Sequence, residues 1–323
     1  MARTRYAPDR GLTARMTATM FLLGLVFVAF VALIIGIGAA THTSDAAIAF
    51  FAIVLGGGLA FMSLFYSDKI ALATAGARVV TPQEAPELHA IVDRLCALAD
   101  MDKPRVAIAP TNIPNAFATG RNSKNSVLCV TQGLLNNTGL TNEELEGVLA
   151  HELSHVAHKD VQVMTIASLL AIIAGLMVRF AFYSELFGGG RRNNNNQNAA
   201  LIMFAIMAAS IVVYAVSFLL IRVLSRYREL AADRSGALLT GQPSALKSAL
   251  IKVSGGMSRI PNQDLRAAEP LNAFYFAPAM KLNRDGSGSG LSKIFSTHPT
   301  LERRIQELDK IQKQLGQVAP KEL

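Results

Sequence analysis

Two histidines four residues apart flank a glutamate in the segment His151-Glu152-Leu153-Ser154-His155. On a helix, residues four apart share a face, so both imidazoles can bind one metal ion at about 2.0–2.1 Å. Glu152 is rotated by about 100° from His151, close enough to activate a water molecule without being a ligand. This pattern predicts zinc-assisted hydrolysis, in which Glu152 takes a proton from water and delivers it to the leaving amine.

The residues before the motif predict the helix that it needs. Thr141 to Glu144 form a capping box, from which a helix should run through His151 to Lys159. A further histidine, His158, shares the face but lies about 10 Å along the axis from His151, too far to bind the same ion. We therefore expect His158 to be solvated near the helix end.

A catalytic zinc needs a third protein ligand and one open position. Glu229 and Asp233 lie four residues apart in a segment that follows an apolar run. One carboxylate can bind the metal while the other orients a histidine. Such a pair is often only a solvated helix face, but the apolar segment before it and the zinc's need for a carboxylate favour Glu229 as ligand. Asp233 is then the orienting group, and one Zn²⁺ is expected per chain.

The composition predicts that part of the chain lies in lipid. The 323 residues are 51% hydrophobic and only 17% charged, less charged than an ordinary soluble domain. Residues 20–40 and 46–66 are each long enough to cross about 30 Å of hydrocarbon and should form a transmembrane hairpin. A second apolar pair, 161–182 and 199–221, flanks a basic, Asn-rich loop, so this pair can span the membrane or lie within a soluble core or at the interface.

Charge fixes the expected orientation and excludes one partner class. Arginines of the N-terminal segment place it in the cytoplasm by the positive-inside rule, so the catalytic part should face the cytoplasm from the inner membrane. The formal charge of +8 could suggest nucleic acid, but no nucleic-acid signature accompanies it. Instead, many arginines adjoin apolar runs, where the lipid bilayer explains them: Arg3, Arg5, Arg10, Arg15, Arg222, Arg226 and Arg228.

The fold class that follows is a mainly α membrane protein with an α+β zincin-type catalytic domain containing a small sheet. The expected soluble elements are a helix over 81–99, strands over 105–109, 115–119 and 126–131, a helix over 222–239 and a C-terminal helix over 301–315. The expected divisions are 1–66 (tail and hairpin), 67–160 and 222–323 (two halves of the catalytic domain), and 161–221 (the inserted pair). Cys96 and Cys129 belong to no paired motif and should be buried, reduced thiols.

At this point the chain resembles the HtpX family of integral-membrane zinc metalloendopeptidases, relatives of the CAAX prenyl proteases. The shared motifs are 115–120 (NAFATG), 151–155 (HELSH), 229–233 (ELAAD) and 296–299 (STHP), in the family's order. The resemblance implies zinc held by His151, His155 and Glu229, with Glu152 as base. It also implies proteolytic quality control of misfolded or damaged membrane proteins from the cytoplasmic face.

Two further roles are expected within these motifs. The resemblance makes Asn115, Ala116, Phe117 and Ala118 an edge strand along which the substrate backbone lies, the alternative being an ordinary core hairpin. His298 is a candidate for stabilising the oxyanion, the alternative being a solvated loop histidine. For the whole protein, a scaffold with structural zinc and a prenylated-protein processing enzyme are the competing interpretations. The sequence predicts no oligomeric state.

Overall fold

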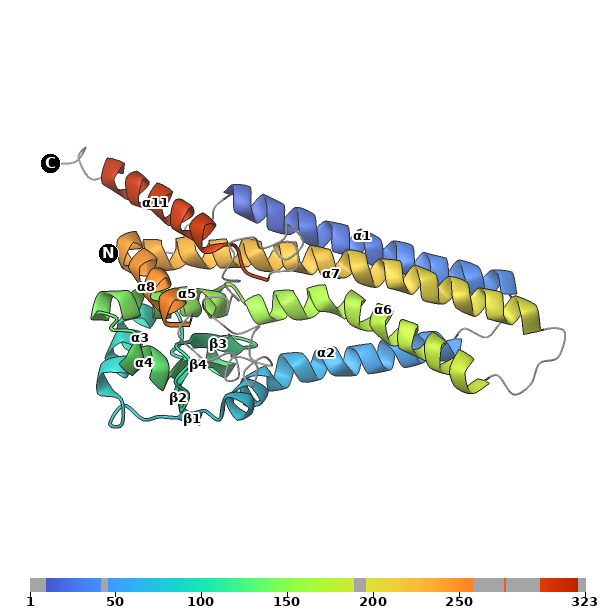
Figure 1. Cartoon of the computed structure of the whole chain (residues 1–323), viewed down its shortest axis with the longest axis horizontal. Coiled ribbons are helices and arrows are strands. Elements are labelled where there is room, and N and C mark those ends of the chain that lie inside the picture. The colour runs from blue at the N-terminus through green and yellow to red at the C-terminus, as the bar shows by residue number, and fades with distance from the viewer. Residues whose placement is uncertain (1–9, 42–45, 189–195, 258–275, 277–296, 319–323) are drawn as a thin grey trace. The chain divides into compact units, whose positions relative to one another are not determined.

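The computed structural model describes residues 10–41, 46–188, 196–257, 276 and 297–318 (Figure 1). The chain divides into two compact units. The sheet unit consists of Leu64–Gln162 and Ser225–Leu323 together with Met1–Thr13, and the apolar unit of Ala14–Ser63 and Val163–Leu224. The stretch 285–290, whose Gly/Ser-rich composition predicts a loop, and the connection 42–45 lie outside the described residues.

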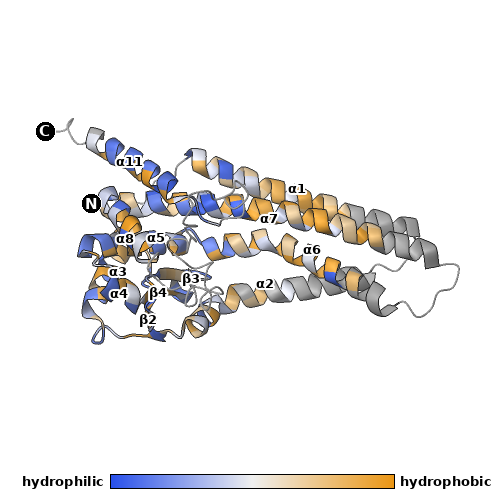
Figure 2. Cartoon of the chain, in the orientation of Figure 1, coloured by the Kyte–Doolittle hydropathy of each residue, from blue (hydrophilic) through white to orange (hydrophobic). Residues whose placement is uncertain are grey.

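Four long helices supply the apolar unit and continue into the sheet unit: α1 (Arg10–Thr41), α2 (Ala46–Ala75), α6 (Asp160–Gly188) and α7 (Asn196–Thr240). Within the described residues, Arg10–Ala32, Asp160–Arg179 and Phe204–Thr240 are long and apolar enough to cross a membrane. Figure 2 shows the apolar residues along these helices. The chain is therefore a membrane protein. Most side chains of the predicted span 46–66 are not described, so its crossing stays a prediction.

The helix α7 runs without a break from the apolar segment 199–221 to Glu229, the predicted third ligand. Its 45 residues correspond to about 68 Å of helix. It ends at Thr240, where Gly241 takes a positive φ of 68°, a conformation that glycine adopts at little cost. A further helix, α8 (Pro243–Met257), begins two residues later. This helix was not among the elements expected from the sequence.

The sheet has four strands in the order β1-β2-β4-β3. Their bounds are β1 (Arg78–Val79), β2 (Arg105–Ala109), β3 (Ala116–Gly120) and β4 (Ser126–Thr131). Three strands were predicted, β3 with a shift of one residue, and the two-residue β1 was not. β2 and β4 are parallel, whereas β3 is antiparallel to β4. Because β3 is last in the order, one of its sides has no neighbouring strand among the described residues, and we call this side the open edge.

The register shows which backbone groups of β3 face that open side. The amide of Thr131 donates to the carbonyl of Asn115 at 2.9 Å, so this pair is hydrogen-bonded between the strands. In an antiparallel ladder such pairs alternate along the strand. Residues 115, 117 and 119 therefore bond to β4, and Ala116, Ala118 and Gly120 direct their N–H and C=O groups to the open edge.

Among the described residues, two buried clusters lie against the sheet, and the smaller one includes Ala71 of α2, Phe117 and Cys129. Five helices enclose the larger core. They are α3 (Pro86–Ala99), α4 (Gln132–Asn137), α5 (Asn142–Ala157), α8 and α11 (Leu301–Val318). Each of these helices contributes at least one fully buried leucine to this core: Leu95, Leu134, Leu149, Leu250 and Leu308. Burial of each such side chain contributes about 1.5–3 kcal/mol. The core thus fixes α5 between β3 and α8, which both contact it.

The helix α5 has the predicted capping box, formed by Thr141 and Glu144. It ends at Ala157, two residues before the predicted Lys159. The reason is that Lys159 itself takes a left-handed φ of 56°, after which α6 starts at Asp160. Both predicted free cysteines are buried, as expected.

Candidate metal centre

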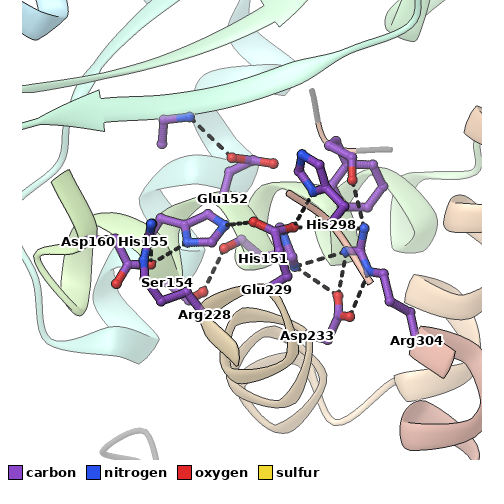
Figure 3. Close-up of polar contacts among 12 residues, drawn as sticks. His151, Glu152, Ser154, His155, Asp160, Arg228, Glu229, Asp233, His298 and Arg304 are labelled. Carbon is purple, nitrogen blue, oxygen red and sulfur yellow. Dashed lines mark hydrogen bonds and ion pairs between the residues drawn. The ribbon is translucent and has the colours of Figure 1, made fainter. Parts of the chain in front are cut away.

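The helices α5 and α7 bring two imidazoles and one carboxylate to a single point. His151, His155 and Glu229 each offer one donor atom, and these atoms lie within 4.8 Å of one another. Nε2 of His151 is 3.8 Å from one oxygen of Glu229, and Nε2 of His155 is 3.6 Å from the other. Figure 3 shows the three side chains directed toward one another.

This donor set fits a tetrahedral zinc ion. Ligand bonds of 2.0–2.1 Å place neighbouring donor atoms of a tetrahedron about 3.3–3.4 Å apart, close to the two observed separations. Both separations are too long for hydrogen bonds. In addition, Nε2 of His151 is buried and has no hydrogen-bond partner among the described residues. A buried, unsatisfied acceptor aimed at a carboxylate is costly unless a cation lies between them.

His151 is oriented through its other nitrogen. Nδ1 of His151 lies 2.9 Å from Oδ1 of Asp233, which fixes the tautomer that leaves Nε2 for a metal. Asp233 in turn accepts two hydrogen bonds from Arg304 of α11, at 2.6 and 2.7 Å. Burial lowers the pKa of His151, against the opposing effect of Asp233, and this direction favours the neutral imidazole that metal binding needs.

His155 has the same arrangement, built from different helices. Its Nδ1 lies 2.5 Å from Oδ2 of Asp160 at the start of α6, and Asp160 is 2.9 Å from Nη2 of Arg228 on α7. Burial lowers the pKa of His155, but Asp160 and other carboxylates raise it more, so the net shift is upward. Each histidine of the centre therefore has a carboxylate partner, and each carboxylate has an arginine.

Glu152 is buried beside the open strand. Its Oε2 accepts a hydrogen bond from the amide of Ala118 at 3.2 Å, one of the edge groups of β3. Burial raises the pKa of Glu152 to about 8, against the lowering effect of His155. The carboxylate thus lies between the donor cluster and the edge strand, where it can exchange a proton with a molecule bound to both.

His298 lies at the centre and is not a solvated loop histidine. Its side chain is buried, and its Nδ1 is 3.0 Å from Oε2 of Glu229. His158, by contrast, is exposed beyond the end of α5, as the helical spacing predicted. The structure therefore groups His298 with the three donors and leaves His158 outside.

Phe276 closes one side of His151. Its ring meets that of His151 edge to face, with centroids 5.0 Å apart. Its amide donates to Oδ1 of Asn115 at 2.9 Å, and its carbonyl accepts from Nη1 of Arg304 at 2.7 Å. The Asn115 side chain, just before β3 begins, thus holds Phe276 beside His151.

Sequence reasoning missed four residues of the centre: Asp160, Arg228, Arg304 and Phe276. Asp160 was within reach, because it follows His155 by five residues and would begin a new helix. Arg228 adjoins Glu229 but was counted only as a membrane-flanking charge. Arg304 and Phe276 come from distant segments and carry no local signal.

Comparisons with known proteins identify the relatives of the chain. The model of peptidase family M48 matches residues 82–312, which include both α5 and the ligand part of α7. Protease HtpX homolog 1 of Streptomyces coelicolor is 54% identical over 315 residues, covering 98% of this chain and 97% of that protein. The Protease HtpX homolog of Moorella thermoacetica is 48% identical over 313 residues, covering 97% and 98%.

A solved structure shares the fold. The crystal structure of S. mikatae Ste24p has a TM-score of 0.51 and 18% sequence identity, covering 93% of this chain and 67% of that one. At this identity the likeness shows the fold alone. The family match over most of the chain and the near full-length identity to the curated relatives go further, and they show that this membrane protein belongs to peptidase family M48, among the HtpX proteases.

Proposed function

We propose that the chain is a zinc endopeptidase in which His151, His155 and Glu229 hold one Zn²⁺ and Glu152 is the general base. The observation that carries this proposal is the convergence of three donor atoms within 4.8 Å beside an acid that also touches the strand edge. Three ligands leave one coordination position open, as catalytic zinc requires and structural zinc does not.

Bound zinc would polarise the scissile carbonyl and make water acidic near neutral pH. The protein's own contribution begins with Glu152, which accepts the proton of the attacking water and passes it to the leaving amine. Asp233 and Asp160 hold the two imidazoles in the tautomer with Nε2 directed inward. Phe276 covers His151 and excludes water from that side.

The open edge of β3 supplies the substrate site. An extended peptide can pair with the outward N–H and C=O groups of Ala116 and Ala118, which read the backbone and little of the sequence. The amide of Ala118 now donates to Glu152. A peptide carbonyl that takes this amide would release the Glu152 carboxylate to act on water. Asn115 contributes by fixing Phe276, while Phe117 bonds to β4.

For His298 we propose stabilisation of the oxyanion that develops on the attacked carbonyl. Support comes from its burial and its position 3.0 Å from Glu229, next to the carbonyl's expected place. Removing one such donor costs about 10²–10³ in turnover. His298→Ala should therefore keep bound zinc and lose turnover, and near-full turnover with intact zinc would refute the role.

The proposed substrates are unfolded segments of damaged or misfolded membrane proteins, cleaved at the cytoplasmic face of the inner membrane. Support comes from the backbone-reading edge, from the apolar helices, and from the N-terminal arginines that favour a cytoplasmic start. Because His151 and Glu229 meet, the chain between them must cross the bilayer an even number of times. Reporter fusions at Asn195 distinguish two crossings from none.

The decisive experiment compares casein cleavage by the wild type and Glu152→Gln at equal zinc occupancy. Loss of the general base should lower turnover by about 10²–10⁴-fold. Glu146→Gln is the matched control, because Glu146 is also a buried acid of α5 but pairs with Arg94. Equal rates for Glu152→Gln and the wild type would leave a non-catalytic scaffold as the better interpretation.

A further inference from the structure

We propose that the turn between β3 and β4, together with the last turns of α2, binds anionic phospholipid headgroups and holds the open β3 edge at the bilayer surface. We call this surface the headgroup patch and define it by Phe65, Tyr66, Lys69, Arg121 and Lys124. The inference rests on the membrane character of the chain. Its consequence for substrate entry rests on the proposed function, but its test does not.

Cations lie over exposed aromatic rings in this patch. The guanidinium carbon of Arg121 is 4.6 Å from the ring centroid of Phe65, and Nζ of Lys69 is 5.4 Å from that of Tyr66. The two aromatic residues are 39% and 44% exposed. Rings with an apolar body beside long basic side chains are typical of the membrane–water interface, where the ring enters the acyl boundary and the cation meets phosphate.

The turn that carries Arg121 has a fixed shape. Gly120 has a φ of 140°, and a Cβ there would lie 2.3 Å from the carbonyl oxygen of Asn125, so only glycine fits. Oδ1 of Asn122 accepts the amide of Asn125 at 2.9 Å. Nε2 of Gln162 donates to the carbonyl of Arg121 at 2.6 Å. The cations of the turn are therefore presented by a fixed backbone, which lowers the entropic cost of binding.

The patch carries an excess of positive charge. Lys69, Arg121 and the exposed Lys124 are cationic. Asp68, on the same stretch of α2, is paired with Arg105 at the start of β2, so it does not cancel them. Clustered basic residues are attracted to anionic lipid, and the attraction falls off within about one Debye length.

The elements that hold the turn both continue along the chain into apolar segments. Phe65 and Tyr66 of α2 are the last two residues of the predicted span 46–66. Gln162 is the third residue of α6, whose residues Asp160–Arg179 form a candidate span. The patch therefore occupies the position in the sequence where apolar helix gives way to the sheet unit, which is the headgroup level of a spanning segment.

The position of the patch also suggests how a substrate enters. Arg121 directly follows Gly120, the last residue of β3. A chain that leaves the bilayer beside Arg121 would meet the edge groups of Gly120, Ala118 and Ala116 in that order. The headgroup patch would thus allow an unfolded membrane segment to pass directly from the bilayer to the β3 edge.

The test measures the distance of the turn from lipid headgroups in nanodiscs that contain the full chain. A fluorophore is attached at Asn125→Cys, and lipids with a nickel-chelating headgroup serve as the quencher. The matched control is Asn137→Cys at the end of α4, which follows the opposite end of β4. The native Cys96 and Cys129 are buried and should not react in the folded protein.

We expect the label in the turn to be quenched severalfold more than the control label. For the protein that keeps Arg121 and Lys124, quenching should fall when phosphatidylglycerol is replaced by phosphatidylcholine. It should also fall when the salt concentration is raised. Arg121→Gln with Lys124→Gln should lower it, whereas Arg303→Gln with Lys313→Gln, two exposed positions of α11, should not. All proteins carry Glu152→Gln, so the result does not depend on cleavage.

Two outcomes would overturn the proposal. Equal quenching at both label positions would show that the turn does not lie at the headgroups. Strong quenching that ignores lipid charge, salt and the double substitution would show that the cations bind something other than anionic lipid, such as a protein partner. Because every protein in this test carries Glu152→Gln, failure of the proposed peptidase function would leave both quenching results unchanged.

Discussion

Asp233→Asn separates the orientation of His151, a proposed metal ligand, from the stability of the protein. Asp233 is fully buried and serves two partners, accepting from Nδ1 of His151 at 2.9 Å and twice from Arg304. Asparagine keeps the shape and one acceptor oxygen. Its amide nitrogen, however, is a donor and would face the donors of Arg304. The substitution therefore weakens the hold on His151 and leaves a buried guanidinium without its counter-charge.

The two effects differ in size. Loss of a carboxylate partner from a ligating histidine lowers metal affinity by about 10–100-fold, or about 1.4–2.7 kcal/mol. Because asparagine still offers an acceptor to His151, we expect the lower end, about tenfold. Breaking a buried ion pair from one side costs about 3–5 kcal/mol. Arg304 keeps its bond to the Phe276 carbonyl, so the free energy of unfolding should fall by about 3 kcal/mol.

The double variant Asp233→Asn with Arg304→Met tests this division. Removing the unpaired cation should restore most of the free energy of unfolding. Metal affinity should stay low, because His151 still lacks its carboxylate. Unfolding is measured in metal-free nanodiscs and affinity by competition with a chelator, with Glu146→Gln as the control that loses a buried acid away from the histidines.

Two results would refute this reasoning. If Asp233→Asn bound metal as tightly as the wild type, Asp233 would not orient His151. If the double variant regained affinity together with stability, the loss of metal in the single variant would be a consequence of general destabilisation.

Three further predictions follow from packing, burial and linkage. Gly236→Ala would place a Cβ 2.9 Å from the backbone nitrogen of His151, so the free energy of unfolding measured with denaturant should fall by about 1–3 kcal/mol. Gly316→Ala is the control: space around this helical glycine is open, so the free energy of unfolding should rise by up to about 1 kcal/mol. Equal effects of the two substitutions would contradict the close approach at Gly236. Burial raises the pKa of Cys129 to about 12 and that of Cys96 to about 11, so a thiolate-selective reagent at pH 8 should label the folded protein far more slowly than the unfolded one. Since both pKa values lie above those of the unfolded chain, their contribution to stability is complete below about pH 8 and is lost as pH rises through 11 to 12. Chelation should lower the unfolding temperature, because metal at 100 times its Kd adds about 2.7 kcal/mol, and an unchanged temperature would mean that no metal binds the folded state.

Spacing and chemistry carried the sequence prediction of the centre. The four-residue repeat put His151 and His155 on one helical face, and the capping box at Thr141 placed the start of that helix. Glu229 was chosen because an ion held by two imidazoles needs a further donor, a requirement of chemistry that does not depend on distance along the chain. The structure brings these three side chains together.

The rest of the centre depends on how distant segments close on one another. Arg304 reaches Asp233 across 71 residues, and no local pattern marks such a pair. The helix α8 begins at Pro243, and proline is favoured in the first turn of a helix, but no helix was expected between the segments 222–239 and 301–315. The strand β1 is only two residues long, too short to show an alternating pattern.

The two imidazole supports differ in what they connect to the metal centre. The support of His155 uses Asp160, the first residue of α6, and Arg228 of α7, both within candidate membrane spans. The support of His151 joins Asp233 of α7 to Arg304 of α11 near the C-terminus. A helix transmits axial displacement along its length, and a slip of one residue moves a side chain by about 1.5 Å, beyond the roughly 0.5 Å that a catalytic site tolerates. Both supports therefore depend on α7, because Arg228 and Asp233 lie in the same candidate span. The support of His155 depends in addition on α6 and that of His151 on α11, so a working centre requires all three helices.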